Sequence, residues 1–185
     1  MPLEKAVGLY CAPALAGIKP SNLLSYVTKN KSNTKTEIAC LNTQLNRSDI
    51  YIDILCEYEN RLLILVYRRK KLGGYLKRGE IADFLKKLGY STQNSLEKNV
   101  ALLSAKISKS SEFPHEVGAF LGYPIEDIYG FINHKNCKYS GYWKVYGNVE
   151  QAKKLFKKYD SCRNAVICRM NKGKSLTDMF ALVRI

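Results

Sequence analysis

The pattern of apolar and polar positions is clearest between residues 50 and 69. From position 50 to 58 the two kinds of residue alternate, as they do along a β-strand with one buried face. One face of this strand is expected to carry Ile50, Ile52, Ile54, Cys56 and Tyr58. Glu59 and Asn60 suit a tight turn, and the run RLLILVYRR then predicts a second, more buried strand. The sequence therefore predicts a β-hairpin.

Helical spacing follows the hairpin. Gly73-Gly74 is expected to end the second strand, and the next apolar stripe has the i, i+3, i+4, i+7 spacing of a helix. This stripe consists of Ile81, Phe84, Leu85 and Leu88. A capping box over residues 94–97 opens another helix, and a further helix is expected over residues 149–159.

The two ends of the chain have weaker patterns. The N-terminal residues predict a short helix that stops at Pro13 and a second helix that begins after Pro20. Residues 28–36 are polar and predict an exposed loop, while residues 37–47 fit either a helix or a strand. Residues 165–185 are expected to contain a strand, a turn and a helix or second strand. Together the elements predict an α+β fold, helix-rich around a small, largely antiparallel sheet.

The segment FPHEVGAFLGYP, residues 113–124, gathers the most distinctive residues of the chain. Pro114 suits the first turn of a helix, Gly122 can end that helix, and Pro124 can begin the next one. The inward side of the second helix is expected to carry Ile125, Ile128 and Phe131. The segment therefore predicts two short helices that meet at a sharp corner.

His115 and Glu116 raise the question of chemistry in this segment. A zinc protease would need a second histidine four residues after His115, and that position is Ala119. Glu116 near a helix N-terminus is favoured by the peptide dipoles, and adjacent helical residues diverge, so it is not expected to orient His115. His115 is either a packing or capping residue or the best single candidate for chemistry.

Length and composition limit the class of protein. A chain of 185 residues fits a single domain, residues 1–185, and a hydrophobic content of 46% is typical of globular proteins. The apolar runs are too short to cross a bilayer, and no export signal is recognisable at the N-terminus. The expected location is the cytoplasm.

The six cysteines are expected to be reduced thiols in that compartment. They are Cys11, Cys40, Cys56, Cys137, Cys162 and Cys168. No two of them have the C-x-x-C spacing of a metal site or redox pair, so the spacing predicts no metal site and favours small buried residues.

The leading hypothesis is a binding or accessory protein for a small ligand, a cofactor or a metal, with its site near the FPHEVGAFLGYP segment. The candidate residues are Cys11, His115, Glu116, Cys137 and Trp143. A Cys/His-dependent enzyme is an alternative, with Cys11 or Cys137 as nucleophile beside His115, but no third catalytic member is identifiable. The sequence names no cofactor or partner; it leaves enzyme activity open and favours binding.

The net charge of +14 gives a second alternative, which is nucleic-acid binding. The basic residues form two groups, the first next to the hairpin and the second on the surface of the helix over 149–159. They are Arg68, Arg69, Lys70 and Lys71, and Lys153, Lys154, Lys157 and Lys158. Lysines on a helix surface are also typical of an ordinary solvated face.

Several runs together resemble one uncharacterised bacterial family, domain of unknown function 3793. They are YCAPALAGIKPSNL, FPHEVGAFLGYPIEDIYGFI, NCKYSGYWKVYGN, LFKKYDSCRNAV and GKSL. The resemblance implies a single-domain cytosolic protein, found mainly in anaerobic Firmicutes, with no established activity. It also implies a histidine where this chain has Tyr10 and a cysteine where it has Tyr142, so a metal or thiol mechanism at those two positions is not expected here.

Overall fold

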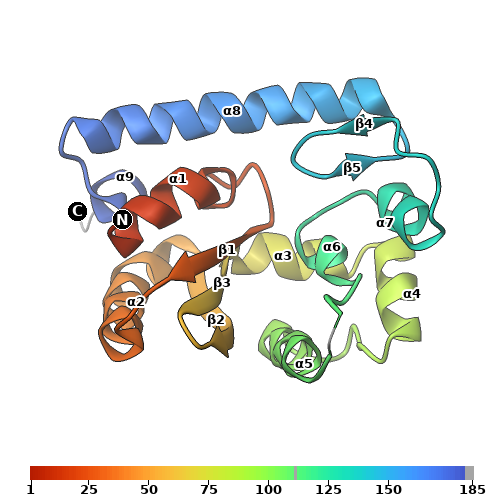
Figure 1. The fold of residues 1–185 in the computed structure, drawn as a ribbon, viewed down its shortest axis with the longest axis horizontal. Helices are drawn as coiled ribbons and strands as arrows, with labels where there is room; N and C mark the ends of the chain where they lie inside the picture. The colour runs from red at the N-terminus through yellow and green to blue at the C-terminus, as the bar shows by residue number, and fades with distance from the viewer. Residues whose placement is uncertain (111, 182–185) are drawn as a thin grey trace.

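A three-stranded sheet forms the centre of the fold in the computed structural model, which describes residues 1–110 and 112–181. The sheet consists of β1 (Ser21–Val27), β2 (Ile50–Tyr58) and β3 (Arg61–Arg68), in the order β1-β3-β2 (Figure 1). Both pairings are antiparallel, and β2 and β3 form the hairpin that the sequence predicts. The α+β class with a small antiparallel sheet is confirmed.

The central strand β3 is buried on both faces. Its residues alternate between two hydrophobic clusters, with Leu62, Ile64 and Val66 in one and Leu63, Leu65 and Tyr67 in the other. A strand covered on both faces has a continuous apolar sequence, which accounts for the run LLILVY. Helices therefore pack on both sides of the sheet.

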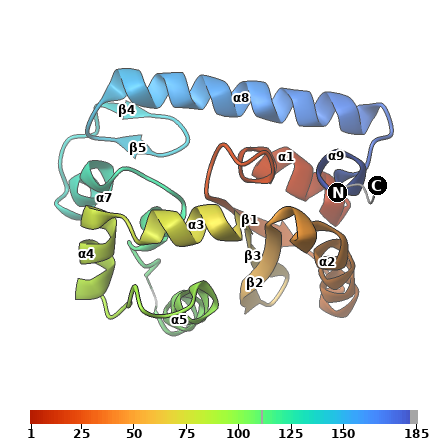
Figure 2. The ribbon, with the colours of Figure 1, turned by 180° about the vertical axis from the view of Figure 1, so that it is seen from behind.

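The first face is covered by α1 (Leu3–Leu15) and α2 (Lys31–Leu45), and α9 (Leu176–Phe180) packs against both of these helices. The short helix η1 (Asn46–Ser48) joins α2 to β2. The second face is covered by α5 and the shorter helices around it (Figure 2). They are α3 (Arg69–Leu76), α4 (Gly79–Lys87), α5 (Leu96–Lys109), α6 (Val117–Phe120) and α7 (Ile125–Ile132).

The long helix α8 (Val149–Asn171) runs beside α1 along one side of the molecule (Figures 1 and 2). A small hairpin of β4 (Tyr139–Ser140) and β5 (Lys144–Val145) lies between the start of α8 and α7. Its side chains form a third hydrophobic cluster with α8, which includes Trp143, Val145, Phe156 and Tyr159. No helix in the described ranges is both long and apolar enough to cross a membrane.

Two expectations for the N-terminal residues are wrong. The first helix does not stop at Pro13 but continues to Leu15, because the last turn buries Ala14 and Leu15 completely against the sheet. That burial outweighs the hydrogen bond that proline cannot donate. The segment after Pro20 is the strand β1 and not a helix, since each of its residues pairs with a residue of β3.

The polar segment expected as a loop contains the start of α2. The helix begins at Lys31, with Asn30 as its N-cap, whose Oδ1 accepts from the Asn33 N–H across 2.9 Å. The ambiguous residues 37–47 continue this helix as far as Leu45. Its buried stripe is Thr34, Ile38, Leu41 and Leu45.

Two more corrections concern the hairpin and the residues after it. The register of β2 shifts between Ile54 and Cys56, so Leu55 is buried and Cys56 packs on the face opposite to the one expected. Such a bulge places one extra residue in a strand and exchanges its faces. Gly73-Gly74 does not end the strand but lies inside α3, where Leu72 and Leu76 face the core.

The C-terminal third agrees in part with the sequence pattern. Trp143 and Val145 are both buried, and the aromatic run 142–146 forms part of a hairpin of two short strands. Phe131 was expected to face inward, yet it is 46% exposed.

The helix expected over residues 149–159 is longer and continues to Asn171, because Val166 extends its buried stripe. The strand expected from residue 165 is therefore wrong as far as 181, and residues 182–185 lie outside the described ranges.

Candidate functional site

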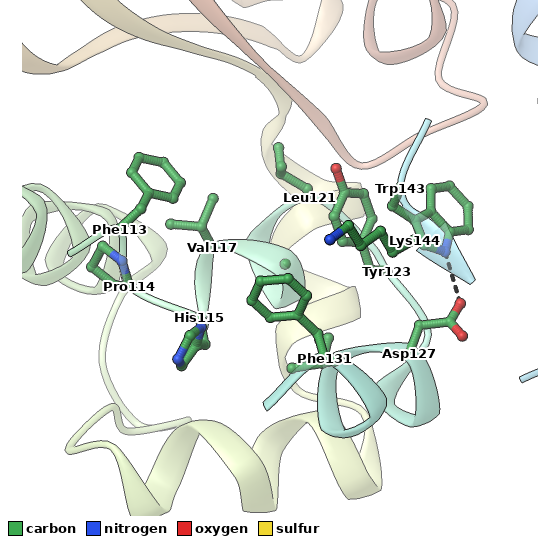
Figure 3. Close-up of a pocket in the computed structure, with 12 residues that line it drawn as sticks. Phe113, Pro114, His115, Val117, Leu121, Tyr123, Asp127, Phe131, Trp143 and Lys144 are labelled. Atoms are coloured by element: carbon green, nitrogen blue, oxygen red, sulfur yellow. Dashed lines mark hydrogen bonds between the residues drawn. The ribbon is translucent and has the colours of Figure 1, made fainter. Parts of the chain in front are cut away.

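A cavity of about 340 Å³ lies beside the corner between α6 and α7 (Figure 3). Its walls are mainly apolar and come from residues 113–121, from α7 and from the hairpin that carries β5. The aromatic side chains that line it are Phe113, Tyr123, Phe131 and Trp143. Its size and apolar walls are typical of sites for small organic molecules.

Two glycines shape the corner next to this cavity. Gly122 has a φ of +74°, a left-handed backbone conformation that glycine adopts without strain, and Pro124 follows as the N-cap of α7. A Cβ at Gly118 would lie 3.2 Å from atoms of both Tyr123 and Ile128. Because these two residues line the cavity, a side chain at position 118 would crowd its wall.

Asp127 holds one wall of the cavity in place. Its Oδ2 accepts a hydrogen bond of 2.7 Å from the indole Nε1 of Trp143, and its Oδ1 accepts from the backbone N–H groups of Tyr146 and Gly147. The Trp143 ring in turn stacks on Tyr123, with ring centroids 4.9 Å apart. One buried carboxylate therefore joins α7 to the β5 hairpin and fixes the orientation of the indole.

Three side chains surround the open side of the cavity. The rings of His115 and Phe131 meet edge to face, with centroids 5.6 Å apart, and both residues are exposed. The Nζ of Lys144 lies 5.6 Å from the centroid of the Phe131 ring, and the side chain extends over the cavity (Figure 3). No described acidic residue forms an ion pair with Lys144. The opening therefore presents one cation and one imidazole above apolar walls.

Glu116 points away from the cavity although it follows His115. It is only 6% exposed, and its Oε1 accepts from Lys106 Nζ across 2.9 Å and from the Tyr90 hydroxyl across 3.3 Å. The burial of Tyr90 itself and, next, the negative charge of Glu116 raise the pKa of the Tyr90 hydroxyl. Glu116 therefore anchors the segment to α5 and does not line the cavity.

The two candidate thiols lie outside the cavity. Cys11 is fully buried in the core between α1 and the sheet, and burial raises its pKa to about 12, so the thiol stays protonated near pH 7. Cys137 is exposed, and its thiol donates to the carbonyl of Tyr139 across 3.1 Å. The structure thus brings together His115 and Trp143 of the five candidates, but not the thiols or Glu116.

Residues 1–110 and 112–181 contain no group of three or more His, Cys, Asp or Glu side chains that could hold a metal ion. The carboxylate of Asp127 in the cavity wall accepts three hydrogen bonds. That carboxylate is therefore already engaged with donors of the protein itself.

Most residues of the first basic group form hydrogen bonds or ion pairs within the protein. The guanidinium of Arg68 donates to the carbonyls of Leu15 and Ser48 and so caps the end of α1. Arg69 forms an ion pair with Glu97, and the Nζ of Lys71 donates to the carbonyl of Gly17. Of this group, only Lys70 has a side chain without a described partner.

The second basic group lies on the surface of α8. Lys153, Lys154, Lys157 and Lys158 are all exposed. Lys153 is also 3.8 Å from Glu150, and its Nζ lies over the Tyr139 ring. The nucleic-acid alternative is thus carried mainly by this one helix.

A family model described as "Protein of unknown function (DUF3793)" matches residues 7–180. The chain belongs to this family. The DUF3793 match includes every residue of the cavity and of the sheet. No curated protein and no solved structure matches the chain.

Within this DUF3793 chain, the segment 113–124 singled out from the sequence supplies seven residues of the cavity, but only His115 and Trp143 of the lining were named as candidates. Asp127, Lys144 and Tyr123 were not among the candidate site residues. The spacing of Asp127 from the aromatic run at 142–146 gives no local signal, since the two meet only through the fold. An exposed Phe131 in a helix of otherwise apolar residues is a weak signal that could have been noticed.

Proposed function

We propose that the cavity beside α6 and α7 binds a small amphipathic molecule with an apolar body and an anionic end. The apolar body would contact the aromatic walls, and the anionic end would lie near Lys144 at the opening. The observation that carries this proposal is the position of the Lys144 ammonium over the Phe131 ring, 5.6 Å from its centroid, above apolar walls. A cation without an acidic partner at an apolar cavity favours an anion over a neutral or cationic ligand.

His115 supports the same function as a neighbouring hydrogen-bonding group. Its imidazole lines the opening beside Phe131 and can donate or accept a hydrogen bond at the polar end of a ligand. The protein would act in the cytoplasm as a binding or accessory protein. Of the six free cysteines only Cys11 is buried, so the expectation of mostly buried cysteines is wrong, while free thiols agree with a reducing compartment.

Two alternatives have less support. A Cys/His enzyme needs a thiolate near His115, and neither Cys11 nor Cys137 lines the cavity that contains His115. Nucleic-acid binding would rely on the α8 lysines, because three residues of the first basic group are engaged in intramolecular contacts. Steeply salt-dependent binding to DNA or RNA would favour that alternative over the cavity.

The decisive experiment uses the fluorescence of Trp143, which is the only tryptophan of the chain and lines the cavity. The protein is titrated with octanoate and with octan-1-ol, two probes that share an apolar chain and differ in the charge of the head group. Octanoate should change the emission in a saturable manner and bind more tightly than the alcohol. Equal affinity for the two probes would contradict the anionic end, and no saturable change with either would contradict the cavity as a site.

Three variants separate the parts of the proposal. Lys144→Met should weaken octanoate binding by about fivefold and leave octan-1-ol unaffected, as expected for one exposed ion pair. Lys154→Met, which removes a lysine charge from α8, is the matched control and should change neither affinity. Val117→Phe should fill part of the cavity and so weaken the binding of both octanoate and octan-1-ol.

A further inference from the structure

Lys19 is a lysine whose ammonium group is held inside the protein. It lies in the turn between α1 and β1, where its backbone N–H donates to the Pro13 carbonyl across 3.0 Å. Only 4% of the residue is exposed. Its Nζ lies 5.2 Å from the ring centroid of Tyr123 and 5.9 Å from that of Tyr159. Lysine is rarely buried to this extent unless a counter-charge accompanies it.

The described residues supply no such counter-charge. None of them forms a hydrogen bond or an ion pair with the Lys19 ammonium, which lies over the faces of the two tyrosine rings. The thiol of Cys11 is close enough to act on it electrostatically, but that thiol is itself neutral at pH 7. Burial consequently lowers the pKa of Lys19 to about 8. The contacts with tyrosine compensate for the lost hydration only in part.

The Lys19 side chain lines a second cavity, of about 390 Å³, together with Arg163 of α8. The Nε of Arg163 is buried and has no hydrogen-bond partner among the described residues. Asn22 contributes an amide, and the exposed Ser25 lies at the edge of the cavity. None of the described residues that line the cavity is acidic.

We propose that this second cavity binds a small anion through Lys19 and Arg163, with a carboxylate or phosphate group as the bound part. The buried Nε of Arg163 is a donor without a partner, which is costly, and the Lys19 ammonium at the same cavity has no acidic or hydrogen-bonding partner among the described residues. A bound oxyanion would supply both the missing charge and the missing acceptors. This site is separate from the cavity beside α6 and α7, although Leu121 and Tyr123 line both cavities.

Anion binding at this site should depend on the charge of Lys19. The groups that face Lys19 are Cys11 on α1, Tyr159 and Arg163 on α8, and Tyr123 at the α6–α7 corner. Burial raises the pKa values of the thiol and of both tyrosines and lowers that of Lys19 to about 8, so among these four groups Lys19 is the one that changes charge near that pH. Binding should therefore weaken as the pH rises through about 8.

The test is a calorimetric titration of the full-length protein with inorganic phosphate and, separately, with acetate, both at constant ionic strength. At least one ion should bind, and the stronger of the two identifies the preferred group. Lys19→Met and Arg163→Gln should each weaken binding by at least about tenfold. Lys154→Met on α8 should change it by less than about twofold, because an exposed lysine is screened by salt. Lys144→Met, in the other cavity, should leave it unchanged.

A second measurement uses the wild-type protein alone. Reductive methylation at about pH 8, followed by mass spectrometry of peptides, reports the reactivity of each lysine. The bound anion should slow the modification of Lys19 relative to that of Lys154. The proposal is overturned if neither ion binds, if Lys19→Met binds as well as the wild type, or if the anion leaves Lys19 labelling unchanged.

Discussion

The indole Nε1 of Trp143 donates to the Oδ2 of Asp127 across 2.7 Å, and both side chains are buried. The hydrogen bond connects a loop residue to a helix residue that lies 16 positions earlier in the chain. Because the same carboxylate also accepts two backbone N–H groups, it is the main polar connection between α7 and the β5 hairpin. Its removal gives the first prediction.

Asp127→Ala should destabilise the protein by about 3 kcal/mol, because it leaves the indole N–H and two backbone N–H groups without acceptors. Urea unfolding measures the change in the free energy of unfolding. The Trp143 emission of the folded variant should also move to longer wavelength as the ring loses its fixed position. Glu126→Gln is the control, since Glu126 is exposed in the same helical turn, and it should change stability by less than about 0.5 kcal/mol. A similar loss in both variants would contradict the role of Asp127.

A second prediction concerns pH and Lys19. Its pKa is lowered in the folded protein from 10.5 to about 8, so the unfolded chain binds more protons between these values. The burial of the charge therefore destabilises the protein fully below about pH 8, and this effect is lost as the pH rises toward 10.5. Lys19→Met should stabilise the protein at neutral pH by up to about 3.5 kcal/mol, given about 1.4 kcal/mol for each pKa unit.

The measurement compares the unfolding free energies of wild type and Lys19→Met at neutral pH and again above the pKa of free lysine. The advantage of the variant should shrink at the higher pH, and using the difference between the two proteins cancels the titration of other groups. A variant that is less stable than the wild type at neutral pH would show that the ammonium has a compensating partner inside the protein.

The parts of the fold that follow from local pattern were predicted from the sequence. Alternation gave the β2–β3 hairpin, and the stripe that includes Phe84 gave α4. The strand β1 was missed because its residues form a strand only by pairing with β3, about 40 positions later, as Leu24 does with Ile64. The bulge after Ile54 was missed for a similar reason, since it depends on the partner strand.

The candidate site was predicted only in its location. His115 and Trp143 line one cavity, in the segment singled out from the sequence and in the loop that follows it. The residues that define its chemistry, Asp127 and Lys144, meet there through packing between α7 and β5. Burial of Lys19 likewise has no local signature, because it arises where α1, α8 and the α6–α7 corner meet.

A third prediction follows from the two glycines inside α3. Gly74 is exposed in the helix, and a Cβ there would meet no atom within 4 Å. Gly74→Ala should therefore stabilise the protein by about 0.5–1 kcal/mol, through the smaller entropy of the unfolded chain. Thermal unfolding of the variant and the wild type measures this gain as a higher melting temperature.

Gly130→Ala is the comparison for that prediction. Gly130 is buried in α7, and a Cβ there would clash with the Cγ and Cβ atoms of Tyr146. The free energy of unfolding of this variant should fall by about 1–3 kcal/mol, because the Tyr146 side chain has to move to make room for the added methyl group. If both alanine variants were destabilised alike, the helical conformation of α3 around Gly74 would be in question.

The last prediction separates the two neighbours His115 and Glu116. Glu116 is buried and accepts from Lys106 and Tyr90, so Glu116→Ala should cost about 2 kcal/mol of stability, a value reduced from that of a fully buried pair because Lys106 is partly exposed. His115 is exposed and touches the Phe131 ring, so His115→Ala should change stability by less than about 0.5 kcal/mol.

The effects on ligand binding should be the reverse. His115→Ala removes a side chain from the opening of the cavity and should weaken octanoate binding, measured by Trp143 fluorescence. Glu116→Ala should leave octanoate affinity within about twofold wherever the variant remains folded, because its carboxylate faces α5 and not the cavity. Urea unfolding of the two variants checks the predicted changes in stability, and the fluorescence titration checks the predicted changes in octanoate affinity. If His115→Ala lost stability and kept full affinity, the histidine would be a packing residue and the opening of the cavity would need another polar contact.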